Sequence, residues 1–118
     1  MSPKVSEAEI MVFTELSRLG LTRGMVTQKT ITLKKPDGTE IQTIPDFIWQ
    51  LSRKLLWLDG NEIHKGWRID RDNEIMEFLN DNDWQGLRIP YHAPLKWGSD
   101  EFVGVIMQII EFLGETKK

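Results

Sequence analysis

The apolar run KLLWLDG, residues 54–60, constrains the fold of this 118-residue chain more than any other stretch. Its length and its stop at Asp59-Gly60 are typical of a short buried strand. Apolar residues make up 40% of the chain, which is enough to build one hydrophobic core at this length. We therefore expect a single domain that spans residues 1–118.

Hydrophobic periodicity places the elements before this run. Residues 7–19 carry apolar side chains at helical spacing and predict an amphipathic helix that ends near Gly20. Residues 26–34 alternate and are rich in β-branched side chains, which is typical of a strand. The turn sequence KPDGT follows, and the run EIQTIPDF at 40–47 predicts a second extended segment. A hairpin is the expected result.

Residues 61–69 read as a loop, and the pattern then returns to a helix over 70–82 whose inward side chains are Ile75, Met76, Phe78 and Leu79. A strand at 86–91 stops at Pro90. The last segment, 100–112, is a helix that is apolar nearly all round, so it is either buried against the sheet or part of a dimer face. The predicted order is α-β-β-β-β-α-β-α, an α/β fold with a mixed central sheet flanked by helices.

Composition excludes several classes of protein. The chain has no cysteine, so it has neither disulfides nor thiolate metal sites. It has no secretory signal pattern and no apolar run of the roughly 18 residues that a membrane span needs, so a cytoplasmic protein without membrane contact is expected. The net charge of -3 disfavours tight, autonomous nucleic-acid binding. It remains compatible with a nuclease, since metal-binding carboxylates themselves lower the charge.

Four polar residues lie at the ends of the central apolar segments. Asp46 follows Pro45, Asp59 ends the buried strand, His64 lies five residues further on, and Asp72 falls in the first turn of the next helix. Two neighbouring strands that end together would bring Asp46 and Asp59 to one edge of a sheet, where Mg²⁺ finds the oxygen ligands it prefers. Asp72 could orient the imidazole of His64.

This set of residues suits hydrolysis of a phosphodiester. A histidine held by an aspartate is a common general base, and a cation stabilises the charge that develops on the phosphate. Each residue also has a structural interpretation. Asp59-Gly60 is a common turn sequence, a single histidine in a loop is usually solvated, and Asp72 can simply favour the start of a helix.

The chain resembles the very short patch repair (Vsr-like) endonuclease superfamily, a branch of the PD-(D/E)xK nucleases, and within it the EDxHD homing endonuclease catalytic domains. Four stretches that together cover residues 6–91 carry the resemblance: SEAEIMVFTEL, IPDF, LLWLDGNEIH and RDNEIMEFLNDNDWQGLRIPY. It implies a restriction-endonuclease-like α-β-β-β-α-β core and a DNA endonuclease of homing or phage type.

The resemblance also implies roles for individual residues. Asp46 would bind Mg²⁺, or Mn²⁺ in its place, with the backbone carbonyl of Leu58 and with Glu9 through water. His64 would be the general base and Asp72 its orienting partner. Asp59 either binds the metal or shapes the loop. The Glu-x-Lys of the wider class is absent, which favours a histidine base, and without cysteine no zinc site is expected.

Double-stranded DNA is the implied partner. The basic residues near the site could contact flanking phosphates: Lys54, Lys65, Arg68, Arg71 and Arg88. They could equally pair with acids such as Asp59 and Glu74. On the hairpin, Lys29, Lys34 and Lys35 could enter the major groove. Target selection would need a homodimer or an additional DNA-targeting domain. The alternative function is a catalytically degenerate module of the same fold that binds DNA or a protein.

Overall fold

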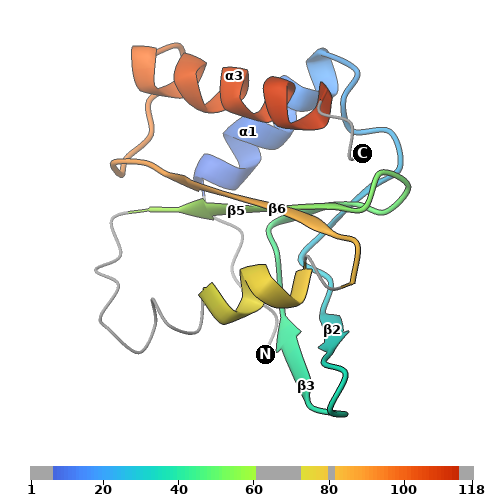
Figure 1. The fold of residues 1–118 in the computed structure, drawn as a ribbon. Coiled ribbons are helices and arrows are strands. Elements are labelled where there is room, and N and C mark those ends of the chain that lie inside the picture. The colour runs from blue at the N-terminus through green and yellow to red at the C-terminus, as the bar shows by residue number, and fades with distance from the viewer. Residues whose placement is uncertain (1–6, 61–72, 80–81, 115–118) are drawn as a thin grey trace. The chain divides into compact units, whose positions relative to one another are not determined.

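The computed structural model describes residues 7–60, 73–79 and 82–114 (Figure 1). Its elements follow the chain in this order: helix α1 (Glu7–Arg18), strands β1 (Met25–Thr27), β2 (Ile31–Lys34), β3 (Glu40–Thr43), β4 (Phe47–Trp49), β5 (Lys54–Asp59) and β6 (Gln85–Pro90), and helix α3 (Asp100–Gly114). Residues 73–79 are helical as well. The helices expected at either end of the chain, the buried strand and the strand that stops at Pro90 are therefore confirmed, and the helix expected over 70–82 is confirmed for residues 73–79.

Four strands form the main sheet, in the order β1-β4-β5-β6. Strand β4 is antiparallel to both β1 and β5, and Phe47 is the register partner of Thr27 on one side and of Leu56 on the other. Strands β5 and β6 run parallel, because Gln85 N–H bonds the carbonyl of Arg53 and Tyr91 N–H bonds the carbonyl of Asp59. The chain is thus a mixed α/β fold with a mixed sheet, as expected.

Strands β2 and β3 form a separate two-stranded hairpin, with Leu33 opposite Ile41. The turn KPDGT closes it as predicted. Lys35 N–H bonds the carbonyl of Thr39, and Gly38 has a positive φ of 91°. Hydrogen bonds from the side chain and the backbone of Thr39 lower the pKa of the Asp37 carboxyl. The turn chemistry in the sequence therefore fixed the hairpin locally.

Both extended runs of the predicted hairpin are divided in the structure. The run 26–34 becomes β1 and β2, separated by Gln28 with a φ of 50°, and the run 40–47 becomes β3 and β4. Strand β1 pairs with β4 in the main sheet, and β2 pairs with β3 in the separate hairpin. Asp46 consequently lies in a bend directly before β4 and not inside a strand. The predicted hairpin pairing is nevertheless retained, because the pairs Thr27–Phe47 and Leu33–Ile41 follow one antiparallel register, and only the ladder between them is interrupted.

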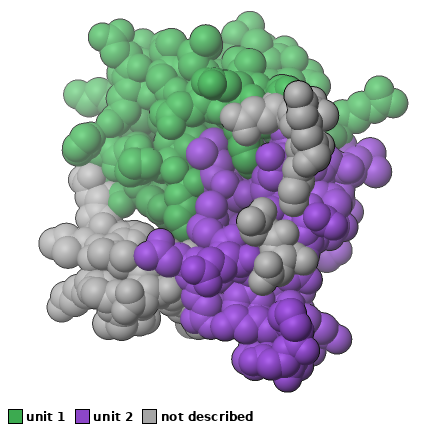
Figure 2. Space-filling view, viewed as in Figure 1, with its two compact units in different colours: residues 1–23, 58–61, 88–118 green, residues 24–57, 62–87 purple. Residues whose placement is uncertain are grey.

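The chain divides into two compact units (Figure 2). Unit 1 comprises Met1–Arg23, Leu58–Asn61 and Arg88–Lys118, and unit 2 comprises Gly24–Trp57 and Glu62–Leu87. Each unit contains part of strands β5 and β6.

The core of unit 2 joins three kinds of element. Leu33 and Ile41 come from the hairpin, and the remaining buried members come from the sheet and from the helical residues 73–79: Ile48, Leu55, Trp57, Ile75, Phe78 and Leu79. Met76 is half-buried against them. Three of the four side chains predicted to point inward from this helix are therefore buried.

Unit 1 contains the two long helices, α1 and α3, which pack against each other (Figure 1). Helix α1 buries Val12 and Leu16 and ends as predicted near Gly20, whose φ is 76°. Helix α3 begins after Ser99, whose hydroxyl accepts a hydrogen bond from the Phe102 N–H at 3.2 Å, as a helix N-cap does. No helix in the described ranges has the length and hydropathy needed to cross a membrane.

Candidate functional site

Asp46 is held by the backbone of its neighbours. Its N–H donates to the carbonyl of Leu56 at 3.0 Å, and its own carbonyl accepts from Gln28 N–H at 3.4 Å. These bonds come from β5 and from the end of β1, so the main sheet fixes the position of the residue on both sides. The side chain of Asp46 is partly exposed. A carboxylate on a rigid backbone with access to solvent is suited to a metal ion.

Leu58 and Asp59 form the last residues of β5, and both are partly exposed. The Asp59 carboxylate lies 3.5 Å from the Arg88 guanidinium, and these two side chains are 22% and 20% exposed. The basic residues near the site were expected either to contact phosphates or to pair with acids. Arg88 pairs with an acid, Asp59. Asp59 is in unit 1 and Asp46 is in unit 2, and the proposed pairing of these carboxylates remains a prediction.

The next residue, Gly60, permits close packing at the end of β5. A Cβ at this position would lie 3.0 Å from the hydroxyl of Tyr91 and 3.1 Å from its Cζ. Tyr91 also donates its N–H to the carbonyl of Asp59 at 2.9 Å. Gly60 therefore has a packing role beside its turn chemistry, because a Cβ there would press on the Tyr91 ring and the ring would have to shift.

Glu9 lies in the first turn of α1, as predicted, and its side chain is half-buried. The other predicted catalytic and DNA-contacting residues, His64, Asp72, Lys65, Arg68 and Arg71, lie outside the described residues, and their roles remain predictions.

The remaining basic candidates differ in their surroundings. Lys54 is 2% exposed in β5, so its burial in this structure does not fit a phosphate contact. On the hairpin, Lys34 lies 3.5 Å from Glu40 and Lys35 lies 3.3 Å from Glu74. Lys35 also lies over the ring of Phe78, 4.7 Å from its centroid. These pairs offset part of the positive charge that the hairpin would present to DNA.

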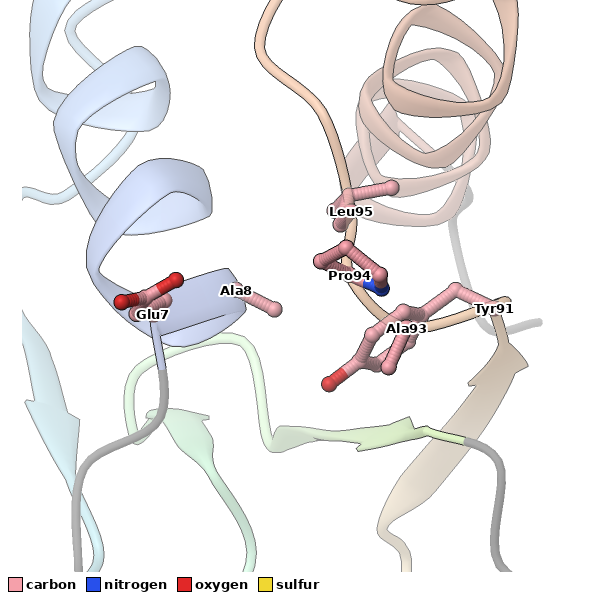
Figure 3. Close-up of a pocket in the computed structure, with 6 residues that line it drawn as sticks. All are labelled: Glu7, Ala8, Tyr91, Ala93, Pro94 and Leu95. Carbon is pink, nitrogen blue, oxygen red and sulfur yellow. The ribbon is translucent and has the colours of Figure 1, made fainter.

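A pocket of about 390 Å³ opens in unit 1 (Figure 3). It is lined by the start of α1 and by the segment after β6: Glu7, Ala8, Tyr91, Ala93, Pro94 and Leu95. Most of this lining is apolar, and polar groups enter it from Glu7 and from the Tyr91 hydroxyl. Sequence patterns do not reveal this pocket, because the two segments that line it are more than 80 residues apart.

A histidine–glutamate pair holds the segment between β6 and α3. His92 Nδ1 lies 2.8 Å from Glu101 Oε2, and the His92 N–H bonds both carboxylate oxygens at 3.2 Å. The side-chain hydrogen bond from His92 is the main cause that lowers the pKa of the Glu101 carboxyl. The His92 side chain is 91% exposed, so the pair is a surface clamp on the first turn of α3.

The residues suit the expected metal only in part. Asp46 and the Leu58 carbonyl are oxygen donors, which is the donor type that Mg²⁺ prefers. Asp59 already has a cationic neighbour in Arg88. Over residues 7–60, 73–79 and 82–114, histidine and acid side chains do not gather in groups of three that could hold a metal ion. A metal ion bound at Asp46 would therefore need further ligands of another kind, such as backbone carbonyls, or ligands outside the described residues.

Comparison of the chain with models of protein families, with curated proteins and with solved structures found no match.

Proposed function

We propose that this protein is a metal-dependent DNA endonuclease that hydrolyses phosphodiester bonds, with a restriction-endonuclease-like core. The observation that carries the proposal is the placement of Asp46 on the main sheet. Its backbone is bonded on both sides, to Gln28 and to Leu56, and the residue is partly exposed. A metal-binding carboxylate needs this combination of fixed position and access.

The order of the elements supports the same class. When the hairpin β2-β3 is treated as an insertion, α1, β1, β4, β5, the helical residues 73–79 and β6 follow one another as α-β-β-β-α-β. The sheet order β1-β4-β5-β6, with a parallel last pair, agrees with a helical crossover between β5 and β6. This order supports the proposed restriction-endonuclease-like core.

In the proposed reaction, Asp46 and the Leu58 carbonyl would hold Mg²⁺, and the ion would supply charge stabilisation at the phosphate. His64 takes the proton of the attacking water, and Asp72 orients the imidazole. Glu9 assists through a water molecule. The role of Asp59 is to shape the end of β5, because its carboxylate is next to Arg88 at 3.5 Å.

The test is cleavage of supercoiled plasmid with Mg²⁺, with Mn²⁺ and with EDTA. Asp46→Asn keeps the size of the side chain and removes its charge, and it should reduce cleavage by a factor of at least about 100, as expected when a metal ligand is lost. Glu77→Gln is the matched control, because Glu77 is exposed on the helical residues 73–79 and removal of its charge should leave cleavage unchanged. An Asp46→Asn protein with wild-type activity would rule out the metal assignment.

His64→Ala tests the proposed base separately. We expect this variant to lose plasmid cleavage while it still binds the metal ion. Calorimetric titration with Mn²⁺ would measure the binding, and circular dichroism would check that the fold is retained. Cleavage at the wild-type rate would show that another group removes the proton.

A catalytically degenerate module that binds DNA or a protein is the second candidate. The pair of Asp59 with Arg88 favours it, because one expected metal ligand already has a charged neighbour. This candidate predicts no plasmid cleavage and no Mn²⁺ binding that depends on Asp46. The endonuclease predicts both, so the two measurements together separate the candidates.

A further inference from the structure

The pocket in unit 1 has the size of a small-molecule site. It lies between the first turn of α1 and the segment that follows β6, and both belong to the same compact unit. Its volume of about 390 Å³ falls within the roughly 300–1,000 Å³ that is typical of such sites. The deepest lining residues are Ala8 and Leu95, at 5% and 7% exposed, whereas Glu7, Ala93 and Pro94 are exposed at the rim. This arrangement suits a ligand that buries an apolar part and keeps one end near solvent.

Small side chains leave this space open. From α1 comes the methyl group of Ala8, which is directed towards the segment on the other side of the pocket (Figure 3), and that segment contributes Ala93. The side chains of the chain itself therefore leave part of the apolar lining uncovered. An apolar group of a ligand that covered this lining would be favourably removed from water.

Tyr91 forms a wall that is held in position. Its N–H donates to the carbonyl of Asp59 at 2.9 Å, and its hydroxyl lies so near Gly60 that a Cβ there would be 3.0 Å away. The hydroxyl is directed towards the α1 side of the pocket (Figure 3). A phenolic hydroxyl both donates and accepts hydrogen bonds, and the face of its ring attracts cations. A wall that is already in place lowers the ordering cost of binding.

The charge of the lining selects the ligand. Among the six described residues that line the pocket, Glu7 alone carries a formal charge, and this charge is negative. Glu9 adds a second negative charge in the same turn, so the two acids offset the preference of a helix N-terminus for anions. His92 lies between two lining residues in sequence, and its ring is bonded to Glu101 on α3. A ligand with a phosphate or carboxylate would be repelled, whereas a cation would be attracted.

We propose that this pocket binds a small organic amine, in which a protonated primary amine is attached to an aromatic ring or a short alkyl chain. The ammonium group pairs with the carboxylate of Glu7 and bonds the hydroxyl of Tyr91, and the apolar part lies against Ala8 and Leu95. For a ligand with a single ring we expect a dissociation constant on the order of 1 mM. This site goes beyond the proposed nuclease activity and does not depend on it.

Titration of the whole chain, labelled with ¹⁵N, with 4-phenylbutylamine tests the proposal through the amide signals in NMR spectra at neutral pH. The signals of Ala8, Tyr91 and Leu95 should shift and saturate. The uncharged 4-phenylbutanol keeps the apolar part and should bind about three- to tenfold more weakly, because the ion pair is lost. The anionic 4-phenylbutyrate should bind more weakly than the alcohol.

Glu7→Gln tests the ion pair. This variant should bind the amine about three- to tenfold more weakly than the wild type and bind the alcohol equally well. Glu111→Gln is the matched control, because Glu111 is an exposed acid of the same unit that does not line the pocket. It should bind the amine like the wild type.

Two further variants fill the pocket. Ala8→Leu adds bulk to the floor, and Ala93→Leu adds the same bulk from the opposite side at an exposed position. Both should lose the amine, and circular dichroism would check that each is folded. Unshifted lining signals in the wild type, equal affinities for the three compounds, or unchanged amine binding by Glu7→Gln would each overturn the proposal. Amine binding that persists in a folded filling variant would also overturn it.

Discussion

The guanidinium of Arg88 lies 3.5 Å from the carboxylate of Asp59, where the ends of β5 and β6 lie next to each other. Each side chain is about one-fifth exposed (20% and 22%), so solvent screens the pair only partly. Because Arg88 already neutralises Asp59, the two candidate metal carboxylates should respond differently to substitution. We expect Asp59→Asn to retain cleavage within about tenfold of the wild type, whereas Asp46→Asn loses it. Plasmid cleavage rates for both variants at equal Mg²⁺ concentrations would show the contrast. Equal losses would assign both carboxylates to the metal.

The same pair should contribute to stability. Arg88→Met keeps an apolar stem of similar length and removes the charge, so it should lower the free energy of unfolding by about 1–2 kcal/mol. In a double-mutant cycle with Asp59→Asn, we expect a coupling energy of about 1 kcal/mol from urea unfolding curves. A coupling near zero would show that the two side chains do not interact in solution.

Two glycines should respond with opposite signs to alanine. A Cβ at Gly86 would lie 2.6 Å from Leu79 Cδ1 and 3.1 Å from both Met76 Sδ and Trp57 Cζ3. Leu79 is 1% exposed, so its methyl group has little space to move away. Gly86→Ala should therefore lower the free energy of unfolding by about 1–3 kcal/mol, as overpacking does. Gly104→Ala, in open space on α3, should raise it by about 0.5–1 kcal/mol. Thermal unfolding of both variants would test the pair, and destabilisation by Gly104→Ala would contradict the reasoning.

Arg53 links its own turn, residues 50–53, to the turn at Asn82 and Asp83. Its guanidinium bonds the carbonyls of Asn82 and Asp83 at 2.6 and 3.2 Å and lies 4.6 Å from the Trp84 ring centroid. Arg53→Ala should lower the free energy of unfolding by about 1–2 kcal/mol, because two charge-assisted hydrogen bonds and a cation–π contact are lost. Arg23→Ala, at an exposed arginine outside such a network, is a control that should change stability by less than about 0.5 kcal/mol. Similar effects of the two substitutions in chemical denaturation would refute the role of the Arg53 contacts.

The clamp between His92 and Glu101 predicts a dependence on pH. The hydrogen bond from His92 holds the pKa of Glu101 below its ordinary value of 4.5. The folded state therefore favours the ionised carboxylate, and this stabilisation is present above the ordinary pKa and is lost as the pH falls through the lowered one. Glu101→Gln should be less stable than the wild type at neutral pH, and the difference should shrink below about pH 4.5. Unfolding curves measured from neutral to acid pH would show this, with Glu111→Gln as a control. A difference that stays constant across this range would exclude the clamp as its source.

Much of the fold could be predicted because its signals are local. Helix α1 ends at Gly20, β5 at Asp59-Gly60 and β6 at Pro90, and in each case the residue at the boundary imposes the change of backbone. The division of 26–34 and of 40–47 could not be predicted in this way. Thr27 pairs with Phe47 in one sheet and Leu33 pairs with Ile41 in another. Both pairs keep the register of one hairpin, and the break between them leaves no mark on the alternation.

The candidate site was predictable only in its residue types. The sequence showed that Asp59 ends a strand, but not that Arg88, on a strand 26 residues later, would lie beside it. Lys54 appeared to be a surface lysine because of its charge, and its burial at 2% exposure depends on the strands around β5. Sequence patterns report the local environment of a residue, whereas charge pairing and burial depend on distant segments.

The hairpin β2-β3 leaves and rejoins the main sheet at one point. Thr27 and Phe47, on either side of the inserted residues 28–46, are register partners. The pairing of β1 with β4 is therefore complete without the inserted residues. The length of this inserted segment can thus change without a change in the register of β1 and β4. Beyond Leu33 and Ile41, whose side chains reach the core, the tip at Asp37-Gly38 can accept added residues without a change in strand pairing. An engineer who wanted to attach a peptide tag or a fluorescent reporter would choose this tip, and natural variation in length should concentrate there.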